Sequence, residues 1–152
     1  MANFPAADCA TSSGANVTAG ELPKSVDKGD GSTLICVVDD DEWVRDSFRT
    51  LLESLDFAVA TYASGREMLA DEQRHRASCL IIDQHMPEMN GLETLGALRR
   101  EGLNVWTILV SGRLDAAITA RAAILDVAAI LEKPFSTTRL IELIRMHCEP
   151  SR

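Results

Sequence analysis

Residues 79–91 read Cys-Leu-Ile-Ile-Asp-Gln-His-Met-Pro-Glu-Met-Asn-Gly. The apolar run leads directly into Asp83, and a continuous run of this kind is typical of a strand buried on both faces in a parallel sheet. The Met-Pro and Asn-Gly pairs that follow indicate an irregular loop. Open α/β sheets bind their ligands at the carboxyl ends of the strands. Asp83 is therefore either a residue that merely begins a loop or a functional carboxylate at the end of a central strand.

The composition limits the kinds of function that fit this chain. Its 152 residues suffice for one domain with a complete core. The net charge of −8 argues against a nucleic-acid-binding surface. The sequence lacks both an apolar run of about 20 residues, which a membrane span needs, and a secretory signal. The spacing of the four cysteines suggests neither zinc nor a redox pair. We therefore expect a cytoplasmic protein that contacts neither nucleic acid nor membrane.

Residues 1–32 differ in composition from the rest of the chain. Asn, Ser, Thr, Gly, Ala and Pro dominate this segment, and apolar periodicity is missing. This pattern predicts a flexible N-terminal tail. The remainder, 33–148, is expected to form one domain, with no output domain in this chain.

From residue 33 onward, strand patterns and helix patterns alternate strictly. The expected strands cover 33–38, 57–62, 77–83, 105–110 and 128–131, and the expected helices cover 42–55, 65–71, 91–100, 114–125 and 137–147. Five strand–helix units in this order predict an α/β fold with a doubly wound parallel sheet, (βα)5. The weaker strand 57–62 is expected at an edge of the sheet, and 73–76 as a polar linker.

Several residues mark the ends of the expected helices. Ser64 and Glu67 are spaced as a capping box. Asn90 and Ser136 are expected to cap the helices that follow them. Gly102 is expected to end the helix 91–100, because glycine readily takes the left-handed conformation there.

Polar residues follow the expected strands at their carboxyl ends. They are Asp39 and Asp40 after the first strand, Asp83 after the third, Ser111 after the fourth and Lys133 after the fifth. Each alone has an ordinary explanation as a helix cap, a turn former or an exposed lysine. Because parallel strands end at the same edge of a sheet, we expect these groups to converge.

Converging carboxylates repel one another unless a cation balances their charge. Mg²⁺ prefers oxygen ligands and binds through one or two carboxylates together with phosphate oxygens. Asp83 would then be a nucleophile that accepts a phosphoryl group. The metal, Lys133 and Ser111 would hold the phosphoryl oxygens.

These segments resemble the receiver domain of two-component response regulators. The resemblance covers about 33–147 and rests on Val-Val-Asp-Asp at 37–40, Leu-Ile-Ile-Asp at 80–83 with the Met-Pro and Gly of the following loop, Val-Ser-Gly at 110–112 and Glu-Lys-Pro-Phe at 132–135. It implies a flavodoxin-like fold and phosphoryl transfer to Asp83 from a histidine kinase or a histidine phosphotransfer protein.

The resemblance also implies the roles of the other site residues. Mg²⁺ would be held by Asp40, Asp83 and the backbone carbonyl of His85, with Asp39 acting through water. Ser111 would swing toward the phosphoryl group. Lys133 would pair with that group, and its bond to Pro134 is expected to be cis.

Three features depart from the usual family pattern. Position 130 usually carries an aromatic switch residue, and here it is Ile130. The family often has Asp where this chain has Asn90. His85 and Arg113 would flank the phosphoryl site and could alter the rate of hydrolysis. His85 could also contribute its side chain to the metal, although a lone loop histidine is more often solvated.

The sequence therefore predicts a phosphorylation-controlled switch that is not a turnover enzyme, with autodephosphorylation at most. Helix 114–125, strand 128–131 and helix 137–147 would present the face that binds a downstream protein. The few charges of helix 114–125 are equally compatible with docking or homodimer formation and with ordinary burial. Two alternatives remain: an interaction module that acts without phosphorylation or as a phosphate sink, and an aspartyl phosphatase. The phosphatase typically needs an acid at the position of His85.

Overall fold

The computed structural model describes residues 33–148. The predicted tail, 1–32, lies outside the described residues. Among the helices that are described, none has the length and apolar character to cross a bilayer.

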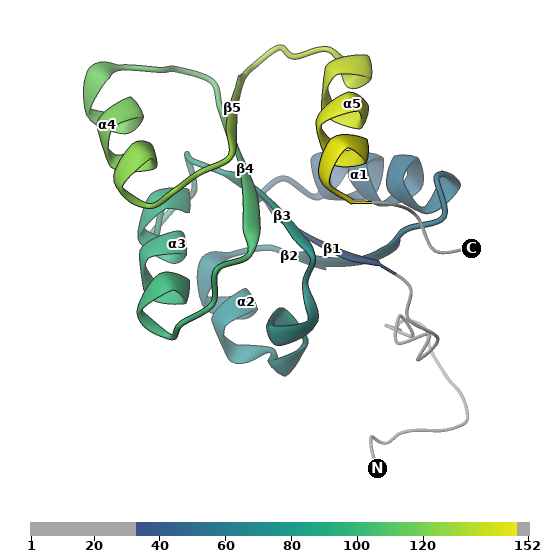
Figure 1. Cartoon of the computed structure of the whole chain (residues 1–152), viewed down its shortest axis with the longest axis horizontal. Helices are drawn as coiled ribbons and strands as arrows, with labels where there is room; N and C mark the ends of the chain where they lie inside the picture. The colour runs from purple at the N-terminus through teal and green to yellow at the C-terminus, as the bar shows by residue number, and fades with distance from the viewer. Residues whose placement is uncertain (1–32, 149–152) are drawn as a thin grey trace. The chain divides into compact units, whose positions relative to one another are not determined.

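The centre of the fold is a sheet of five parallel strands (Figure 1). They are β1 (Leu34–Val38), β2 (Ala58–Tyr62), β3 (Cys79–Asp83), β4 (Trp106–Ser111) and β5 (Ala129–Glu132). Their order across the sheet is β2-β1-β3-β4-β5, and each neighbouring pair is parallel. The predicted flavodoxin-like α/β sheet is confirmed, and β2 lies at an edge as expected.

Helices cover both faces of this sheet. They are α1 (Glu42–Ser54), α2 (Gly65–Ala70), α3 (Gly91–Arg100), α4 (Ala116–Ile124) and α5 (Thr137–His147). Figure 1 shows α1 and α5 on one side of the sheet and α2, α3 and α4 on the other. Every residue of β1 and β3 is buried because these strands have helices on both faces, which explains their continuous apolar runs.

The hydrophobic core under α1 and α5 joins alternate strand residues to the apolar stripes of the two helices. Its members include Ile35, Ile81 and Ile108 from the sheet, Phe48 and Leu52 from α1, and Leu140 and Ile144 from α5. The free thiols Cys36, Cys79 and Cys148 are buried. These packed strands position the residues that follow them.

The predicted helix starts are present, with one difference. Asn90 forms a complete capping box with Glu93. The Ser64 hydroxyl accepts from the Glu67 N–H at 3.1 Å, but the Glu67 carboxylate accepts from the N–H of Ala63 instead of Ser64. Ser136 caps α5.

Three helices end with the same backbone motif. Residues in the left-handed conformation follow α1, α3 and α4: Asp56 (φ 72°), Gly102 (φ 87°) and Asp126 (φ 62°). In each case the next N–H donates to a carbonyl five residues back, as in a Schellman motif. Only the glycine was predictable from its type; at the other two positions aspartate accepts the strain of this conformation.

The predicted bounds of the strands and helices lie within two residues of the observed ones, and two differences have a clear structural cause. Helix α4 begins at Ala116 instead of 114, because the carboxylate of Asp115 caps it by accepting from the Ile118 N–H at 2.8 Å. The expected linker 73–76 belongs to a 3₁₀ helix, η2 (Glu72–Arg76). Asp71 caps this helix and also accepts a hydrogen bond from the Tyr62 hydroxyl at 2.9 Å.

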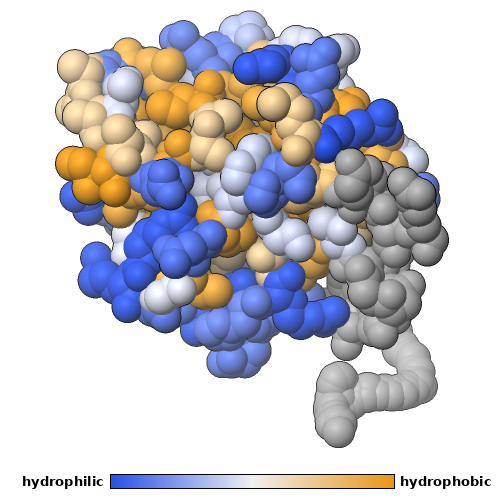
Figure 2. Space-filling model, viewed as in Figure 1, coloured by the Kyte–Doolittle hydropathy of each residue, from blue (hydrophilic) through white to orange (hydrophobic). Residues whose placement is uncertain are grey.

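Helix α4 is unusually exposed for so apolar a helix. Ala122 is its one buried residue, and Ile124 is 73% exposed. Hydrophobic colour is prominent in the upper left of Figure 2, where Figure 1 places α4. Ordinary burial is therefore the wrong explanation for the few charges of this helix.

Candidate functional site

The predicted polar residues lie together at the carboxyl edge of the sheet. Asp39 follows β1, Asp83 ends β3, Ser111 ends β4 and Lys133 follows β5. These four strands are neighbours. The register pairs Val38 with Ile82, and Asp39 and Asp83 are the residues that directly follow this pair on the two adjacent segments of the sheet. Parallel pairing alone thus brings distant parts of the chain to one place.

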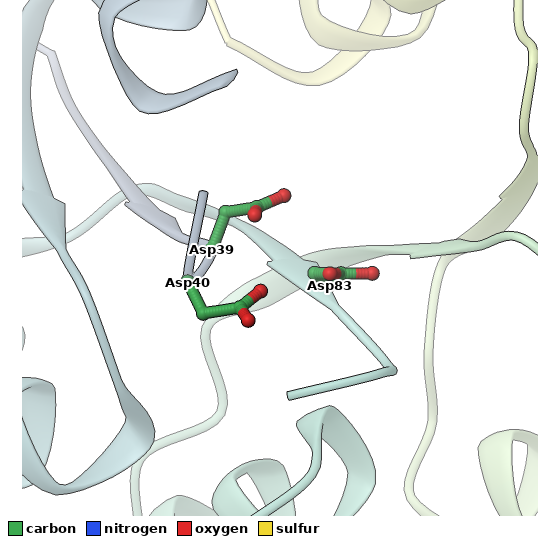
Figure 3. A group of neighbouring side chains, drawn as sticks. All are labelled: Asp39, Asp40 and Asp83. Atoms are coloured by element: carbon green, nitrogen blue, oxygen red, sulfur yellow. The ribbon is translucent and has the colours of Figure 1, made fainter. Parts of the chain in front are cut away.

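Three carboxylates form the centre of the site. Carboxylate oxygens of Asp39, Asp40 and Asp83 lie within 4.8 Å of one another. Figure 3 shows Asp39 and Asp40 on consecutive positions after β1, with Asp83 extending beside them from β3. Asp39 and Asp83 are only 3% and 5% exposed, whereas Asp40 is exposed. The group therefore combines two shielded acids with one that reaches solvent.

Lys133 supplies the positive charge nearest to these acids. Its Nζ lies 3.5 Å from Asp83 Oδ1 and 4.0 Å from Asp39 Oδ2. The Lys133–Pro134 bond is cis, as the resemblance implies. One ammonium group cannot neutralise three carboxylates. Burial raises the pKa of Asp39 to about 6, and the charges of Asp83 and Asp40 add to this effect, against the Asp41 N–H and Lys133.

The acids that follow β1 divide into two groups. Asp41 caps α1, since its carboxylate accepts from the Trp43 N–H at 2.9 Å. The N–H of Asp41 in turn donates to Asp39 Oδ1 at 2.9 Å. Arg45 donates to the Asp39 carbonyl at 2.7 Å and fixes the backbone at this turn. Helix capping thus explains Asp41 but not the two acids before it.

A buried glutamine, which no sequence pattern indicated as a site residue, holds the backbone beside the central acid. Gln84 is 7% exposed, and its Oε1 accepts from the Leu92 N–H at 2.9 Å in the first turn of α3. Its own N–H continues the sheet by donating to the Val110 carbonyl at 2.8 Å. The N–H of Gly91 donates to its carbonyl at 3.1 Å. Both the side chain and the backbone carbonyl of Gln84 therefore bind the loop after β3 to the start of α3.

Gly91 lies directly against the backbone of the central acid. A Cβ atom at this position would be 2.6 Å from the Asp83 carbonyl oxygen and 3.1 Å from the Gln84 Cα. Both are backbone atoms, so they cannot move aside without shifting the end of β3. Glycine is required here because only a residue without Cβ permits this approach.

We expect Gly91→Ala to lower the free energy of unfolding by about 1–3 kcal/mol, because the added methyl group overpacks fixed backbone. Gly112→Ala is the matched control at the same edge of the sheet, since nothing lies within 4 Å of its added Cβ. The control should be neutral or stabilising by up to about 1 kcal/mol. Urea denaturation of both variants checks the difference, and equal values would contradict the steric explanation.

Ser111 is fully buried, and its hydroxyl contacts a residue from another loop. The hydroxyl donates to the Arg113 carbonyl and accepts from the Arg113 N–H at 3.2 Å. His85 Nε2 lies 3.1 Å from Ser111 Oγ. His85 is an exposed residue, whereas the hydroxyl that its ring contacts is buried. The sequence placed His85 near the site by resemblance but did not predict this contact.

Ile130 lies farther from the edge than the other predicted residues. It is partly buried in β5 and pairs with Leu109, whereas Ser111 pairs with Glu132 two residues later.

The donor set fits a magnesium ion. The carboxylate oxygens are hard ligands of the kind that Mg²⁺ prefers. Their combined negative charge exceeds the single positive charge of Lys133. Burial disfavours the ionised form of Asp39, so a bound cation would stabilise it. Asp83 offers a carboxylate at the end of β3, Asp40 offers one two residues after β1, and Asp39 lies beside them.

Comparison with known proteins identifies the family of this chain. The family model described as the response regulator receiver domain matches residues 35–145. The chain is 35% identical over 114 residues to the transcriptional regulatory protein FixJ of Azorhizobium caulinodans, which covers 75% of this chain and 54% of that protein. It is 31% identical over 116 residues to the response regulator protein TodT of Pseudomonas putida, covering 76% and 51%.

A solved structure shows the same architecture. The CheY-like response regulator receiver domain protein of Methanospirillum hungatei superposes with a TM-score of 0.72 at 25% identity, covering 76% of this chain and 93% of that one. The chain spans about half the length of the curated relatives it matches. The family model, the curated relatives and the shared fold agree. The chain belongs to the response regulator receiver domains, a family of phosphoacceptor domains in two-component signalling.

Proposed function

We propose that this chain is a phosphorylation-controlled switch whose acceptor is Asp83. The observation that carries the proposal is the position of this carboxylate. It ends a central strand, is 5% exposed, and lies 3.5 Å from the Lys133 ammonium and beside Asp39 and Asp40. A shielded nucleophile next to a fixed cation suits phosphoryl transfer, which depends on positioning and charge stabilisation.

The phosphoryl donor would be a phosphohistidine of a histidine kinase or a phosphotransfer protein. A carboxylate oxygen of Asp83 forms the new O–P bond as the N–P bond of the donor breaks. The donor imidazole keeps the electron pair of that bond and takes up a proton from solvent. Lys133 remains beside the acceptor oxygen and stabilises the added negative charge. Later attack of water on phosphorus returns the carboxylate and releases inorganic phosphate, so the site resets itself.

Mg²⁺ would be held by Asp40, Asp83 and the backbone carbonyl of His85, with Asp39 acting through water. When bound, the ion neutralises charge on the phosphoryl oxygens. Asp39 orients this site from a buried position, where its backbone is fixed by Arg45.

Ser111 would link phosphorylation to a change in the partner surface. Its hydroxyl is held by the loop that leads into α4, so donation to a phosphoryl oxygen requires it to release the Arg113 carbonyl. The face formed by α4, β5 and α5 would bind the downstream protein or a second copy of the chain. The exposed apolar residues of α4 support this assignment. The buried free thiols fit a cytoplasmic location.

The direct test is incubation with acetyl phosphate, with Mg²⁺ or with EDTA, followed by intact mass spectrometry. We expect the mass of one phosphoryl group to be added only with Mg²⁺. Peptide mapping should place this group on Asp83. Failure to modify the protein under either condition would contradict the proposal. Modification without any change in affinity for partners would instead support a module that does not switch.

A further inference from the structure

The contact between His85 and Ser111 joins two loops that the fold brings together. His85 lies two residues after β3, and Ser111 is the last residue of β4. His85 Nε2 and Ser111 Oγ are 3.1 Å apart. The serine is completely buried, while the histidine is exposed. The side chain of an exposed residue thus reaches a hydroxyl that solvent does not contact.

The other hydrogen bonds of Ser111 decide the direction of this contact. A hydroxyl has one hydrogen and two lone pairs. The hydrogen is donated to the Arg113 carbonyl, and the Arg113 N–H occupies one lone pair. The remaining lone pair faces His85, so the ring must donate from Nε2. All the hydrogen-bonding capacity of the serine is therefore used.

This satisfied arrangement competes with phosphoryl recognition. Ser111 can give its single hydrogen to the Arg113 carbonyl or to a phosphoryl oxygen on Asp83, but not to both. A hydroxyl that turns to the phosphoryl group also leaves the Nε2–H of His85. That N–H therefore stabilises the unphosphorylated arrangement more than the phosphorylated one. A group that favours one state lowers the affinity for any ligand that requires the other.

We propose that His85 is a positioning residue that holds the Ser111 hydroxyl on the Arg113 carbonyl and so restrains the switch in its unphosphorylated state. This role rests on the proposed function of Asp83 as acceptor. It concerns the side chain of His85, whereas the proposed Mg²⁺ site would use the backbone carbonyl of the same residue. A change of side chain therefore separates the two roles.

The first test measures binding of beryllium fluoride, a mimic of the acyl phosphate, in saturating Mg²⁺ by titration calorimetry. Loss of one hydrogen bond from the resting state should tighten binding by about three- to tenfold in His85→Ala. His85→Gln keeps a side-chain N–H donor and should return binding toward the wild-type value. His75→Ala is the matched control, because it removes another exposed histidine, located in η2. It should leave the affinity unchanged.

The second test asks whether His85 acts through Ser111. In a Ser111→Ala background the imidazole has no hydroxyl to hold, so His85→Ala should no longer change the affinity. Equal tightening with and without the hydroxyl would overturn the proposal, because His85 would then act on the ligand directly. Weaker binding by His85→Ala would overturn it as well.

The third test uses no phosphate or metal. Long-range ¹H–¹⁵N spectra should show the neutral ring of His85 with its proton on Nε2, and Ser111→Ala should shift this resonance. A neutral ring protonated on Nδ1 would overturn the hydrogen bond and the proposal with it. If the wild-type protein binds no beryllium fluoride, the proposed function and the restraining role fail together. In that case the tautomer of His85 still shows whether the hydrogen bond to Ser111 is present.

Discussion

Replacing Asp83 with asparagine should abolish covalent phosphoryl uptake from acetyl phosphate. An amide is a poor nucleophile, and the substitution otherwise preserves the size of the side chain. The change also removes one of three converging carboxylates, so the fold should not be weakened in the absence of Mg²⁺. Loss of modification without loss of stability would separate a chemical effect from a folding effect. Intact mass spectrometry and thermal unfolding measure the two quantities on the same sample.

Asp41→Asn is the matched control for this experiment. Asp41 is two residues past Asp39, but its carboxylate caps α1 and is not one of the three clustered acids. Asparagine is an equally good helix cap, so the control should keep both its stability and its phosphoryl uptake. Uptake by Asp83→Asn at the wild-type rate would show that the acceptor is another residue.

The carboxyl-edge geometry was predictable because it follows from backbone pairing. Apolar runs that end in Asp83 and in Asp39 identify buried parallel strands, and such strands must end at the same edge of the sheet. Side-chain length then brings Lys133 within 3.5 Å of Asp83. Local composition and the strand–helix alternation therefore suffice to assemble the acidic site.

Other features depend on information that residue types do not carry. Asp56 and Asp126 take the left-handed conformation that the sequence predicted only at Gly102, because an aspartate in a polar segment has many conformations open to it. Gln84 resembles an ordinary loop residue, yet it is buried, and its side chain accepts a hydrogen bond from the first turn of α3. The contact of His85 with Ser111 requires the rotamers of residues on two separate loops.

Asp39→Asn should stabilise the protein in EDTA at pH 7 and weaken its binding of Mg²⁺. Burial and the neighbouring acids raise the pKa of Asp39 from 3.8 to about 6, so its charge opposes folding at neutral pH. Removing that charge should raise the free energy of unfolding by about 1–3 kcal/mol at pH 7. Mg²⁺ affinity should fall by about 10- to 100-fold, as expected for a residue that supports a metal through water.

The raised pKa of Asp39 also determines how the stability of the wild-type protein changes with pH. As the pH falls from 7 toward 5, folded wild-type protein takes up the Asp39 proton before the unfolded chain does, because the folded-state pKa is the higher of the two. Wild-type stability should therefore rise toward that of Asp39→Asn, and the difference should vanish below about pH 4. Saturating Mg²⁺ at pH 7 should stabilise the wild-type protein more than the variant, since it binds the ion more tightly. Urea denaturation in EDTA and in Mg²⁺ at several pH values checks both trends. A variant less stable than wild type in EDTA at pH 7 would contradict the prediction, because the Asp39 charge would then support the fold.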